Sequence, residues 1–375
     1  MNAKLLFLLL IFFEISPGFA QFYYFDTPIA MPFLGTNIGD PVAAALGETG
    51  VTSYSGGSQG ILLNPAHVNR AKTWEAFSLY RGFASLKRNR NSIFKERNMK
   101  YYAIGVSGRV EKNKNIGFFL QRFNDHSSYK NDTGESYFSN INETIVGFSF
   151  GTRLKKNLLW GINAKYLVDS RFGARNSGVA LDLGLNWILP ASAVFDKRPD
   201  FNQLAPEQKS IFSIGLALKN TGLEMDFGKF PIKRPLPQTL YFGMAYQQIL
   251  AKLHFRGLFE FEKRLIRFDE EKREYDPFYK ALFTAWKGKT LKEAVYHFGL
   301  ETNIFNRISL RYGLRYEPVR PVDQTIITYG IGIDLKYLSI NFGKWKNPDY
   351  DSFYNIIDTY TDSYSVSVNV KNIHF

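Results

Sequence analysis

Hydrophobic and polar residues alternate along most of the chain beyond residue 73, in blocks of eight to twelve residues. In the block 158–169 the even positions carry Leu, Trp, Ile, Ala, Tyr and Val, whereas most odd positions carry Gly, Asn, Lys or Asp. The block 307–317 repeats this pattern. Because successive side chains of a β-strand point to opposite faces, each block predicts a strand with one apolar and one polar face.

About 14 such blocks follow one another to the end of the chain. They lie at 74–85, 100–110, 115–124, 143–154, 158–169, 177–189, 210–219, 238–248, 252–263, 294–303, 307–317, 325–335, 337–345 and 363–375. An even number of strands leaves both ends of the chain on the same side of a sheet that closes on itself.

The connections between these blocks alternate in length. Tight turns follow the second, fourth, eighth, tenth and twelfth blocks, and the segment 190–209 after the sixth block is the exception. The other connections include longer polar loops at 86–99, 125–142, 221–236, 264–293 and 346–362. Short periplasmic turns and long outer loops are typical of bacterial outer-membrane barrels.

A soluble β-sandwich or propeller is the alternative fold, because its strands also alternate with a period of two. Such folds have no reason to alternate loop length over fourteen strands. A charged residue on the second face of nearly every strand also fits a wet or plugged lumen. We therefore expect an all-β fold, a transmembrane antiparallel β-barrel of about 14 strands.

The N-terminus predicts export. Lys4 precedes an apolar run at 5–13, and the small residues Gly18 and Ala20 precede a signal-peptidase site, so residues 1–20 are read as a signal peptide. The run is less than half of the roughly 20 residues that span a bilayer. With the barrel pattern, this places the protein in the outer membrane of a Gram-negative bacterium.

The composition is explained by the alternation. The chain holds 34 Phe, 22 Tyr and 5 Trp, yet its mean hydropathy is −0.22, because only one face of each strand is apolar. It has no Cys, which excludes a disulfide scaffold, thiolate metal sites, cysteine catalysis and a lipidated N-terminal cysteine.

The formal charge of +13 has a local concentration in the first long loop. Basic side chains at an outer rim can pair with lipopolysaccharide phosphates, and the expected contacts are Arg88, Arg90, Lys95 and Arg97. Nucleic acid is the competing partner for a basic protein. We expect none, because the chain is exported and its aromatic residues follow barrel spacing.

Residues 21–73 lack the alternation. The stretch 43–51 (AAALGETGV), followed by Asn64, Pro65 and Ala66, resembles the opening of FadL-type outer-membrane barrels. The resemblance implies an N-terminal hatch (21–73) inside a 14-stranded barrel (74–375), with these three residues in the hatch. It also extends to the PorV/PorQ-like branch, whose members serve the type IX secretion system. An ordinary Asn-Pro turn into the first strand is the alternative.

Glycine recurs about once per strand on or near the polar face. Glycine inside a strand is costly unless another group approaches the backbone closely. A plug or ligand in the lumen would explain it, and so would strand curvature. The glycines are Gly105, Gly117, Gly147, Gly161, Gly184, Gly215, Gly243, Gly299, Gly313 and Gly330.

The sequence offers little catalytic chemistry. Residues 147–151 match G-x-S-x-G, but Ser149 lies within a strand pattern and not at a strand-to-helix turn. The five histidines show no metal-ligand spacing, although His254 and His297 fall on polar faces of neighbouring strands and could meet in the lumen. We expect no cofactor, no metal and no enzymatic activity.

Two features concern the lumen and the long loops. Opposite charges on adjacent strands predict a structural network inside the lumen, formed by Arg256, Glu260, Glu301, Arg311 and Arg315. In the loop 264–293, helical spacing within 277–296 predicts a short lid or partner-docking helix.

A third feature concerns the last strand. Its valines occupy even positions, whereas Ile373 and Phe375 occupy odd ones. For all of them to face the same side, the strand needs a β-bulge, or else it ends early.

Two functional classes fit this sequence. The first is a non-enzymatic component of type IX protein secretion or cell-surface attachment, resembling PorV/PorQ-like barrels, with secretion-system subunits or exported cargo as partners. The second is a FadL-like transporter that takes up hydrophobic small molecules through a hatch-gated lumen. The charged lumen and polar loops favour the first, whereas hydrophobic residues between hatch and wall would favour the second.

Overall fold

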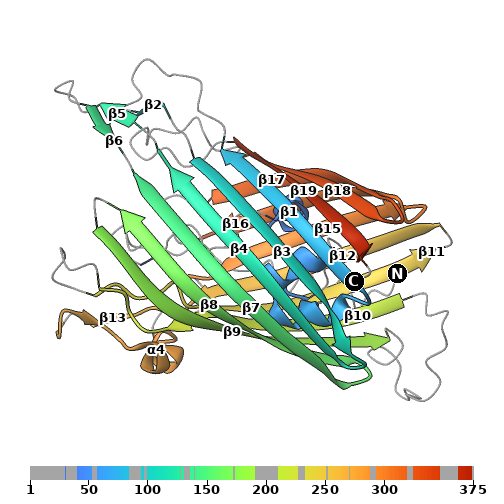
Figure 1. Cartoon of the computed structure of the whole chain (residues 1–375), viewed down its shortest axis with the longest axis horizontal. Coiled ribbons are helices and arrows are strands. Elements are labelled where there is room, and N and C mark those ends of the chain that lie inside the picture. The colour runs from blue at the N-terminus through green and yellow to red at the C-terminus, as the bar shows by residue number, and fades with distance from the viewer. Residues whose placement is uncertain are drawn as a thin grey trace.

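Fourteen antiparallel strands form a closed barrel in the computed structural model of the chain (Figure 1). The structure describes residues 30, 40–52, 57–83, 94–96, 99–126, 128–130, 136–138, 140–171, 174–190, 210–226, 233–250, 252–269, 271–287, 293–318, 324–346 and 362–373. The predicted signal peptide and most of the 190–209 connection lie outside the described residues.

Each predicted block corresponds to one barrel strand, with ends that agree within three residues. The first seven strands are β1 (Trp74–Phe83), β3 (Met99–Glu111), β4 (Lys114–Asp125), β7 (Ile141–Lys155), β8 (Leu158–Arg171), β9 (Ala174–Pro190) and β10 (Ser210–Gly222). The others are β11 (Thr239–Leu250), β12 (Leu253–Arg264), β15 (Val295–Ile304), β16 (Ile308–Glu317), β17 (Gln324–Asp334), β18 (Leu338–Lys346) and β19 (Asp362–Ile373). The predicted strand count is confirmed.

Neighbouring strands of the barrel are consecutive along the chain, and β1 pairs with β19 to close it. Five tight turns and the 190–209 connection join strands at one end, which we call the turn end, and the other connections join strands at the opposite end, the loop end. Two loop-end connections are short, at 172–173 and 318–323. Others carry structure of their own: β2 (Phe94–Glu96), β5 (Ser128–Lys130) and β6 (Ser136–Phe138) form a small sheet.

The barrel is apolar outside and polar inside. Phe118 and Leu185 are 49% and 41% exposed on the outer surface, whereas the inward-pointing Ser149 and Asp182 are buried. A soluble sandwich would show the reverse, because its apolar faces would meet in a core. A continuous exposed apolar surface of this kind suits contact with lipid. The helices in the described part of the chain are all too short or too polar to traverse a bilayer.

The predicted irregularity in the last strand is a β-bulge. Ala76 pairs with Val370, but Trp74 pairs with Ile373, so β19 holds one residue more than β1 over this interval. The extra residue reverses the parity of the side chains after Val370, as expected. Phe375 lies outside the described residues.

Candidate functional site

Residues 40–52 and 57–71, which we call the hatch segment, lie inside the barrel (Figure 1). Helix α2 (Pro41–Ala45) packs against β16 to β19, and the 3₁₀ helix η2 (Pro65–Arg70) packs against β7, β8 and β9. Between them, η1 (Gly57–Leu62) contacts β1 and β3. The hatch segment therefore touches opposite sides of the wall.

Local sequence explains how α2 fits there. Asp40 caps its N-terminus by accepting hydrogen bonds from the backbone N–H groups of Val42 (2.7 Å) and Ala43 (3.1 Å), and Pro41 occupies the first turn. The helix is otherwise built from Val and Ala, so its backbone can approach the wall closely.

The wall glycines make room for the hatch backbone. A Cβ at Gly313 would collide with the Gly47 nitrogen, and one at Gly184 with the Asn64 side chain. For most of the predicted glycines, this close approach favours a plug in the lumen over strand curvature as the explanation. Gly105 and Gly147 differ, because Phe77 and Phe119 of the wall itself cover them. Further glycines against the hatch segment are Gly151, Gly161, Gly215, Gly243, Gly299, Gly330 and Gly343.

Asn64 connects two parts of the hatch segment with the wall. Its side-chain oxygen accepts from the Ala66 N–H (2.9 Å) and caps η2, with Pro65 at the first position. Its amide nitrogen donates to the carbonyl of Val51 (2.7 Å) and to that of Leu185 on β9 (3.0 Å). The Asn-Pro pair is thus a helix start, and it is also a buried cross-link.

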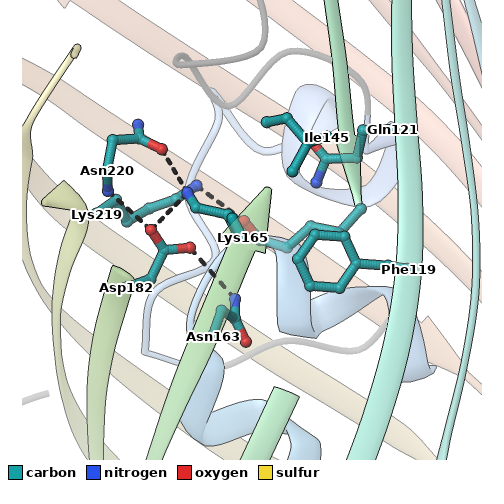
Figure 2. Close-up of a pocket in the computed structure, with 9 residues that line it drawn as sticks. Phe119, Gln121, Ile145, Asn163, Lys165, Asp182, Lys219 and Asn220 are labelled. Carbon is teal, nitrogen blue, oxygen red and sulfur yellow. Dashed lines mark hydrogen bonds and ion pairs between the residues drawn. The ribbon is translucent and has the colours of Figure 1, made fainter. Parts of the chain in front are cut away.

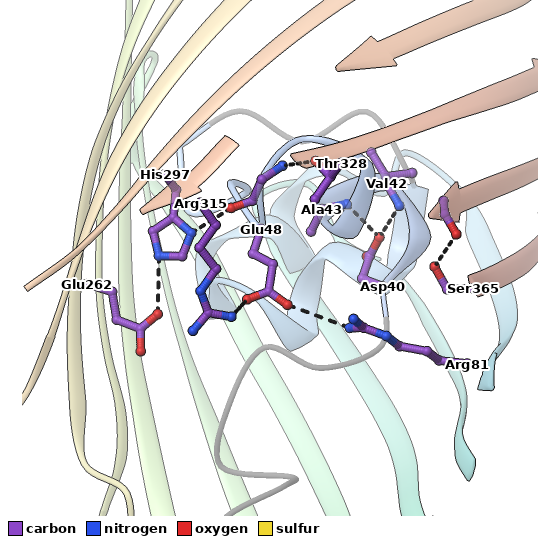
Figure 3. Close-up of polar contacts among 12 residues, drawn as sticks. Asp40, Val42, Ala43, Glu48, Arg81, Glu262, His297, Arg315, Thr328 and Ser365 are labelled. Carbon is purple, nitrogen blue, oxygen red and sulfur yellow. Dashed lines mark hydrogen bonds and ion pairs between the residues drawn. The ribbon is translucent and has the colours of Figure 1, made fainter. Parts of the chain in front are cut away.

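The turn after α2 is held by polar wall side chains (Figure 3). Gly47 and Glu48 both have left-handed φ angles, of 69° and 68°. The Gly47 N–H donates to Thr328 Oγ1 (2.8 Å), and its carbonyl lies 2.6 Å from His297 Nδ1. His297 Nε2 lies 3.2 Å from Glu262 Oε2. A single residue of the hatch segment, Gly47, is therefore fixed by both β15 and β17.

Glu48 is a buried carboxylate between two arginines of the wall (Figure 3). It forms ion pairs with Arg315 of β16 and with Arg81 of β1, the latter at 3.6 Å. The guanidinium of Arg81 also stacks on the ring of Trp345, 3.9 Å from its centroid. Buried charges need such partners because burial removes their water, so Glu48 ties the hatch to strands on both sides of the barrel closure.

Glu260, one of the five predicted lumen charges, binds the backbone of the hatch segment. Its Oε1 accepts from the backbone N–H groups of Gly50 and Val51, both at 2.7 Å. Arg315 binds Glu48 and, at 2.7 Å, Glu317. These two residues face hatch residues that sequence reasoning had not paired with them.

The other three predicted charges form a separate cluster nearer the turn end. Glu301 lies between Arg256 (3.0 Å) and Arg311 (2.7 Å), which are its register partners on β12 and β16. Arg311 also donates to Asn341 Oδ1 (3.0 Å). The predicted set is thus divided among three places and is not one network.

His254 and His297, which could have met in the lumen, lie apart. His254 pairs with Asn303 and His297 with Glu260, so six residues of β12 separate them along the barrel. At about 3.3 Å per residue, that is roughly 20 Å. The described residues contain no cluster of His, Asp and Glu that could hold a metal. Ser149 lies within β7 and donates to Asn163, away from any strand-to-helix turn.

A second polar cluster, missed from the sequence, lies beside the hatch segment (Figure 2). Lys165 of β8 forms an ion pair with Asp182 of β9 at 2.6 Å, and Lys219 of β10 donates to the Leu62 carbonyl at 2.8 Å. The inward parity of these residues was visible in the alternation. Their convergence depends on strand register, which the pattern does not supply.

Buried apolar side chains also gather on the inward face of the wall, between polar ones such as Gln121, Glu143 and Asp169. We call this set the apolar lumen cluster, and it joins the hatch segment to β1, β3, β4, β7, β8 and β9. It comprises Ala30, Ile61, Leu62, Val68, Phe77, Leu79, Tyr101, Ala103, Phe119, Phe123, Ile145, Leu167, Ala180, Met225 and Leu236. Ala30 is held there by a hydrogen bond from its N–H to the Pro235 carbonyl (2.9 Å).

The lumen is filled where the described residues meet. A cavity beside Phe119, Lys165 and Asp182 has a volume of about 10 Å³ (Figure 2). That space suits one water molecule. Any larger solute would require the hatch segment or its neighbours to move.

The loop between β12 and β15 holds the predicted helix. Helix α4 (Phe278–Thr284) is short and lies within the stretch 277–296, and it follows the small hairpin β13 (Phe268–Asp269) and β14 (Glu274–Tyr275). Tyr279 and Phe283 are 61% and 77% exposed on one side of α4.

Asp276 anchors this helix from the preceding turn. It accepts a hydrogen bond from Thr284 Oγ1 (2.7 Å) and pairs with Lys280. Burial alone would raise the pKa of Asp276, but the hydrogen bonds from Lys280 and Thr284 outweigh it, so the pKa lies below its ordinary value.

The predicted lipopolysaccharide contacts cannot be placed in the same way. Arg88, Arg90 and Arg97 lie outside the described residues, and Lys95 is described only by its backbone, within β2.

Solved barrels share this architecture at very low sequence identity. The toluene transporter TbuX of Ralstonia pickettii aligns with a TM-score of 0.52 and 13% identity over 89% of this chain and 98% of its own. The toluene transporter TodX of P. putida gives 0.54 and 12% over 89% and 98%. A FadL homologue of Pseudomonas aeruginosa gives 0.51 and 8% over 88% and 98%. No protein-family model and no curated protein matches the sequence.

These likenesses show the fold, that of FadL-type outer-membrane barrels. They do not single out the PorV/PorQ-like branch that the sequence resemblance also included. The neighbours are described as toluene transporters and a monoaromatic hydrocarbon channel.

Proposed function

We propose that this chain is an outer-membrane channel of a Gram-negative bacterium that passes hydrophobic small molecules through a lumen closed by its hatch. We assign residues 21–73 to the hatch and 74–375 to the barrel. The observation that carries the proposal is the apolar lumen cluster between hatch and wall. Neighbours described as a toluene transporter and a monoaromatic hydrocarbon channel have the same fold.

The apolar lumen cluster offers a surface for hydrocarbon groups. Phe119 and Phe123 point inward from β4 and are 4% and 0% exposed, beside Ile61 and Leu62 of the hatch segment. Aromatic side chains of this kind line most small-molecule sites. Phe119 and Phe123 face the lumen, where there is no lipid for their rings to contact. An apolar solute that enters the lumen would be a suitable partner for these rings.

Passage requires a change in the hatch, because the hatch segment lies inside the barrel and touches opposite sides of the wall. Hydrogen bonds and ion pairs, including those of Glu48, Asn64 and Glu260, attach it to the wall together with apolar packing. Water can replace the polar contacts as the segment moves, and an apolar solute can replace part of the apolar packing.

Secretion is the second candidate, and α4 is the feature that favours it. The exposed Tyr279 and Phe283 form an aromatic surface at the loop end, of the composition common at protein interfaces. The lumen charges, which had favoured secretion in the sequence, support it less now that Glu260 and Arg315 are engaged with the hatch segment.

The test is uptake of radiolabelled toluene and of a long-chain fatty acid by Gram-negative cells that lack other barrels of this fold. Cells with the full-length protein should take up at least one of the two faster than cells with an empty vector. Phe119→Ser and Phe123→Ser should lower that uptake several-fold, because each removes an aromatic ring from the proposed path.

Phe118→Ser is the matched control, since Phe118 lies next to Phe119 but is 49% exposed on the outer face. Heat-modifiable migration on gels would confirm that each variant forms a barrel. Equal uptake with and without the protein would contradict the transport proposal. Secretion subunits or cargo that co-purify from detergent-solubilised membranes would then support the second candidate.

A further inference from the structure

The turn end of the barrel carries a ring of exposed cationic side chains, which we call the basic rim. They lie on the five tight turns and just before β1. The members are Lys72, Arg109, Lys112, Lys114, Arg153, Lys155, Lys156, Lys252, Arg307 and Lys336. Two acidic side chains lie among the described residues of these turns: Glu111, which pairs with Lys114 at 2.9 Å, and Asp334, which pairs with Lys371 at 2.7 Å. Neither the lumen nor the hatch segment uses these cations.

Apolar side chains are interleaved with the basic rim at the same level. Phe305 and Tyr337 are 59% and 56% exposed, and leucines accompany them on neighbouring turns. The Lys252 ammonium lies 5.5 Å from the Phe305 ring centroid, and that of Lys336 lies 4.8 Å from the Tyr337 ring. A ring beside an ammonium group suits the boundary between acyl chains and headgroups.

The described loop end differs in its charge pattern. There, Lys272 lies 4.0 Å from Asp269, and Lys263 lies 2.9 Å from Glu293. Exposed cations and carboxylates are mixed at that end, whereas exposed cations outnumber exposed carboxylates at the turn end among the residues that the structure describes.

We propose that the basic rim binds the anionic headgroups of phospholipids in the leaflet that surrounds the turns. The proposal rests on the membrane placement given under the proposed function. It follows from charge complementarity and from position, because the cations ring the barrel where its lipid-facing apolar surface ends. An acidic periplasmic protein could use the charge, but it would not explain the exposed apolar side chains that accompany the cations.

Trp187 is a built-in probe of this lipid. It is 45% exposed on the outer face of β9 and pairs with Leu158, the first residue of β8 after a turn. The full chain is reconstituted in vesicles of phosphatidylcholine that contain brominated phosphatidylglycerol or, separately, brominated phosphatidylcholine. Subtracting the signal of Trp187→Phe isolates the quenching of this residue.

We expect brominated phosphatidylglycerol to quench Trp187 with an apparent affinity about five-fold higher than brominated phosphatidylcholine. That is the preference expected for a single lysine near an anionic lipid surface. The preference should fall in 0.5 M salt, because ions screen exposed charges.

A four-fold variant tests the rim directly. Lys112→Gln, Lys155→Gln, Lys156→Gln and Lys336→Gln together should reduce the preference to near unity. The control variant removes four cations from the loop end and should keep it. Its substitutions are Arg175→Gln, Lys233→Gln, Lys272→Gln and Lys287→Gln.

Equal quenching by the two lipids in the unmodified chain would overturn the proposal and point to an acidic protein as the partner of the rim. An equal loss of preference in both four-fold variants would overturn it as well, since net charge alone would then be responsible. A chain that does not float with vesicles would refute membrane placement itself, an outcome that the flotation step separates from a loss of lipid preference. Hydrocarbon uptake is measured independently of all three.

Discussion

The two halves of the hatch segment are attached to the same wall by different chemistry. Residues 47–52 are held by charged side chains, with Glu48 between arginines and Glu260 on successive backbone N–H groups. Residues 57–71 are held mainly by asparagine amides and by apolar packing, with one charged donor, Lys219, on the Leu62 carbonyl. Asn163 donates to the Ile61 carbonyl (3.0 Å), and Asn115 donates to that of Ala71 (2.7 Å).

This difference predicts how each half responds to change. Removing one partner of a buried ion pair leaves the other charge without compensation, which is costly. Removing one neutral hydrogen bond costs less. We therefore expect residues 47–52 to come loose in an all-or-none way and residues 57–71 to weaken by degrees. In a gated barrel, the charged half would then be the part that decides whether the hatch stays in place.

The largest expected effect is that of Glu48→Ala. It removes the carboxylate shared by Arg81 and Arg315, and it should destabilise the attachment of the hatch by about 3–5 kcal/mol. Trypsin should cleave within the hatch of the variant far faster than in the unmodified protein, while the barrel still shows heat-modifiable migration.

Glu111→Ala is the control, because its pair with Lys114 is exposed on both sides. Such a pair contributes about 0–1 kcal/mol, so cleavage should not change. If Glu48→Ala were also without effect on cleavage, the charged half would not be the stronger attachment.

The next effect concerns the glycines that the hatch touches. Gly313→Ala places a Cβ against the Gly47 backbone, and overpacking of this kind costs about 1–3 kcal/mol. We expect a lower urea midpoint for folding and faster hatch cleavage. Gly257→Ala is the matched control on the same barrel, because its Cβ would meet only Leu300 at 3.8 Å. Equal effects of the two substitutions would argue that backbone entropy matters here and not close approach.

Asn64→Ala probes the neutral half. It removes the cap of η2 and the hydrogen bonds to Val51 and Leu185, and loss of an N-cap costs about 0.5–2 kcal/mol. Amide hydrogen exchange should speed up in η2 but remain unchanged in α2. Faster exchange in both helices would show that the two halves are coupled, contrary to the comparison drawn above.

The smallest effect lies outside the lumen, at Asp276. Because its pKa is lowered in the folded protein, its contribution to stability is present above the ordinary carboxyl pKa and is lost as the pH falls through the folded value. Pepsin should therefore cleave the loop at 271–287 more readily as the pH drops below about 4. Asp276→Asn should remove this dependence while the barrel stays intact, and a dependence that persists would assign it to another carboxylate.

The strands were predictable because their cause is local. Each needs only the period-two pattern and a turn at its end, so 158–169 could be read without knowledge of its neighbours. The bulge in β19 was predictable for the same reason, since a change of parity is visible in the chain. The short helix after residue 277 was predictable as well, because helical spacing of apolar residues is a local signal.

The partners across the lumen were not predictable from the pattern. Parity puts Glu260 and Arg315 on the inward face, but the residues they bind, Gly50 and Glu48, lie more than two hundred positions away. The same holds for Lys165 and Asp182, whose meeting depends on the register of β8 and β9. His254 and His297 share a face, and register nevertheless keeps them apart.

The amino-acid sequence by itself determined that fourteen strands close a barrel with an apolar exterior, because side-chain alternation and turn spacing act within a few residues. The tertiary structure alone decided what the polar interior does. It set which charges hold the hatch, which glycines yield to its backbone and where apolar residues gather in the lumen. Those are contacts between distant segments, and they exist only once strand register and barrel closure have fixed which residues face one another.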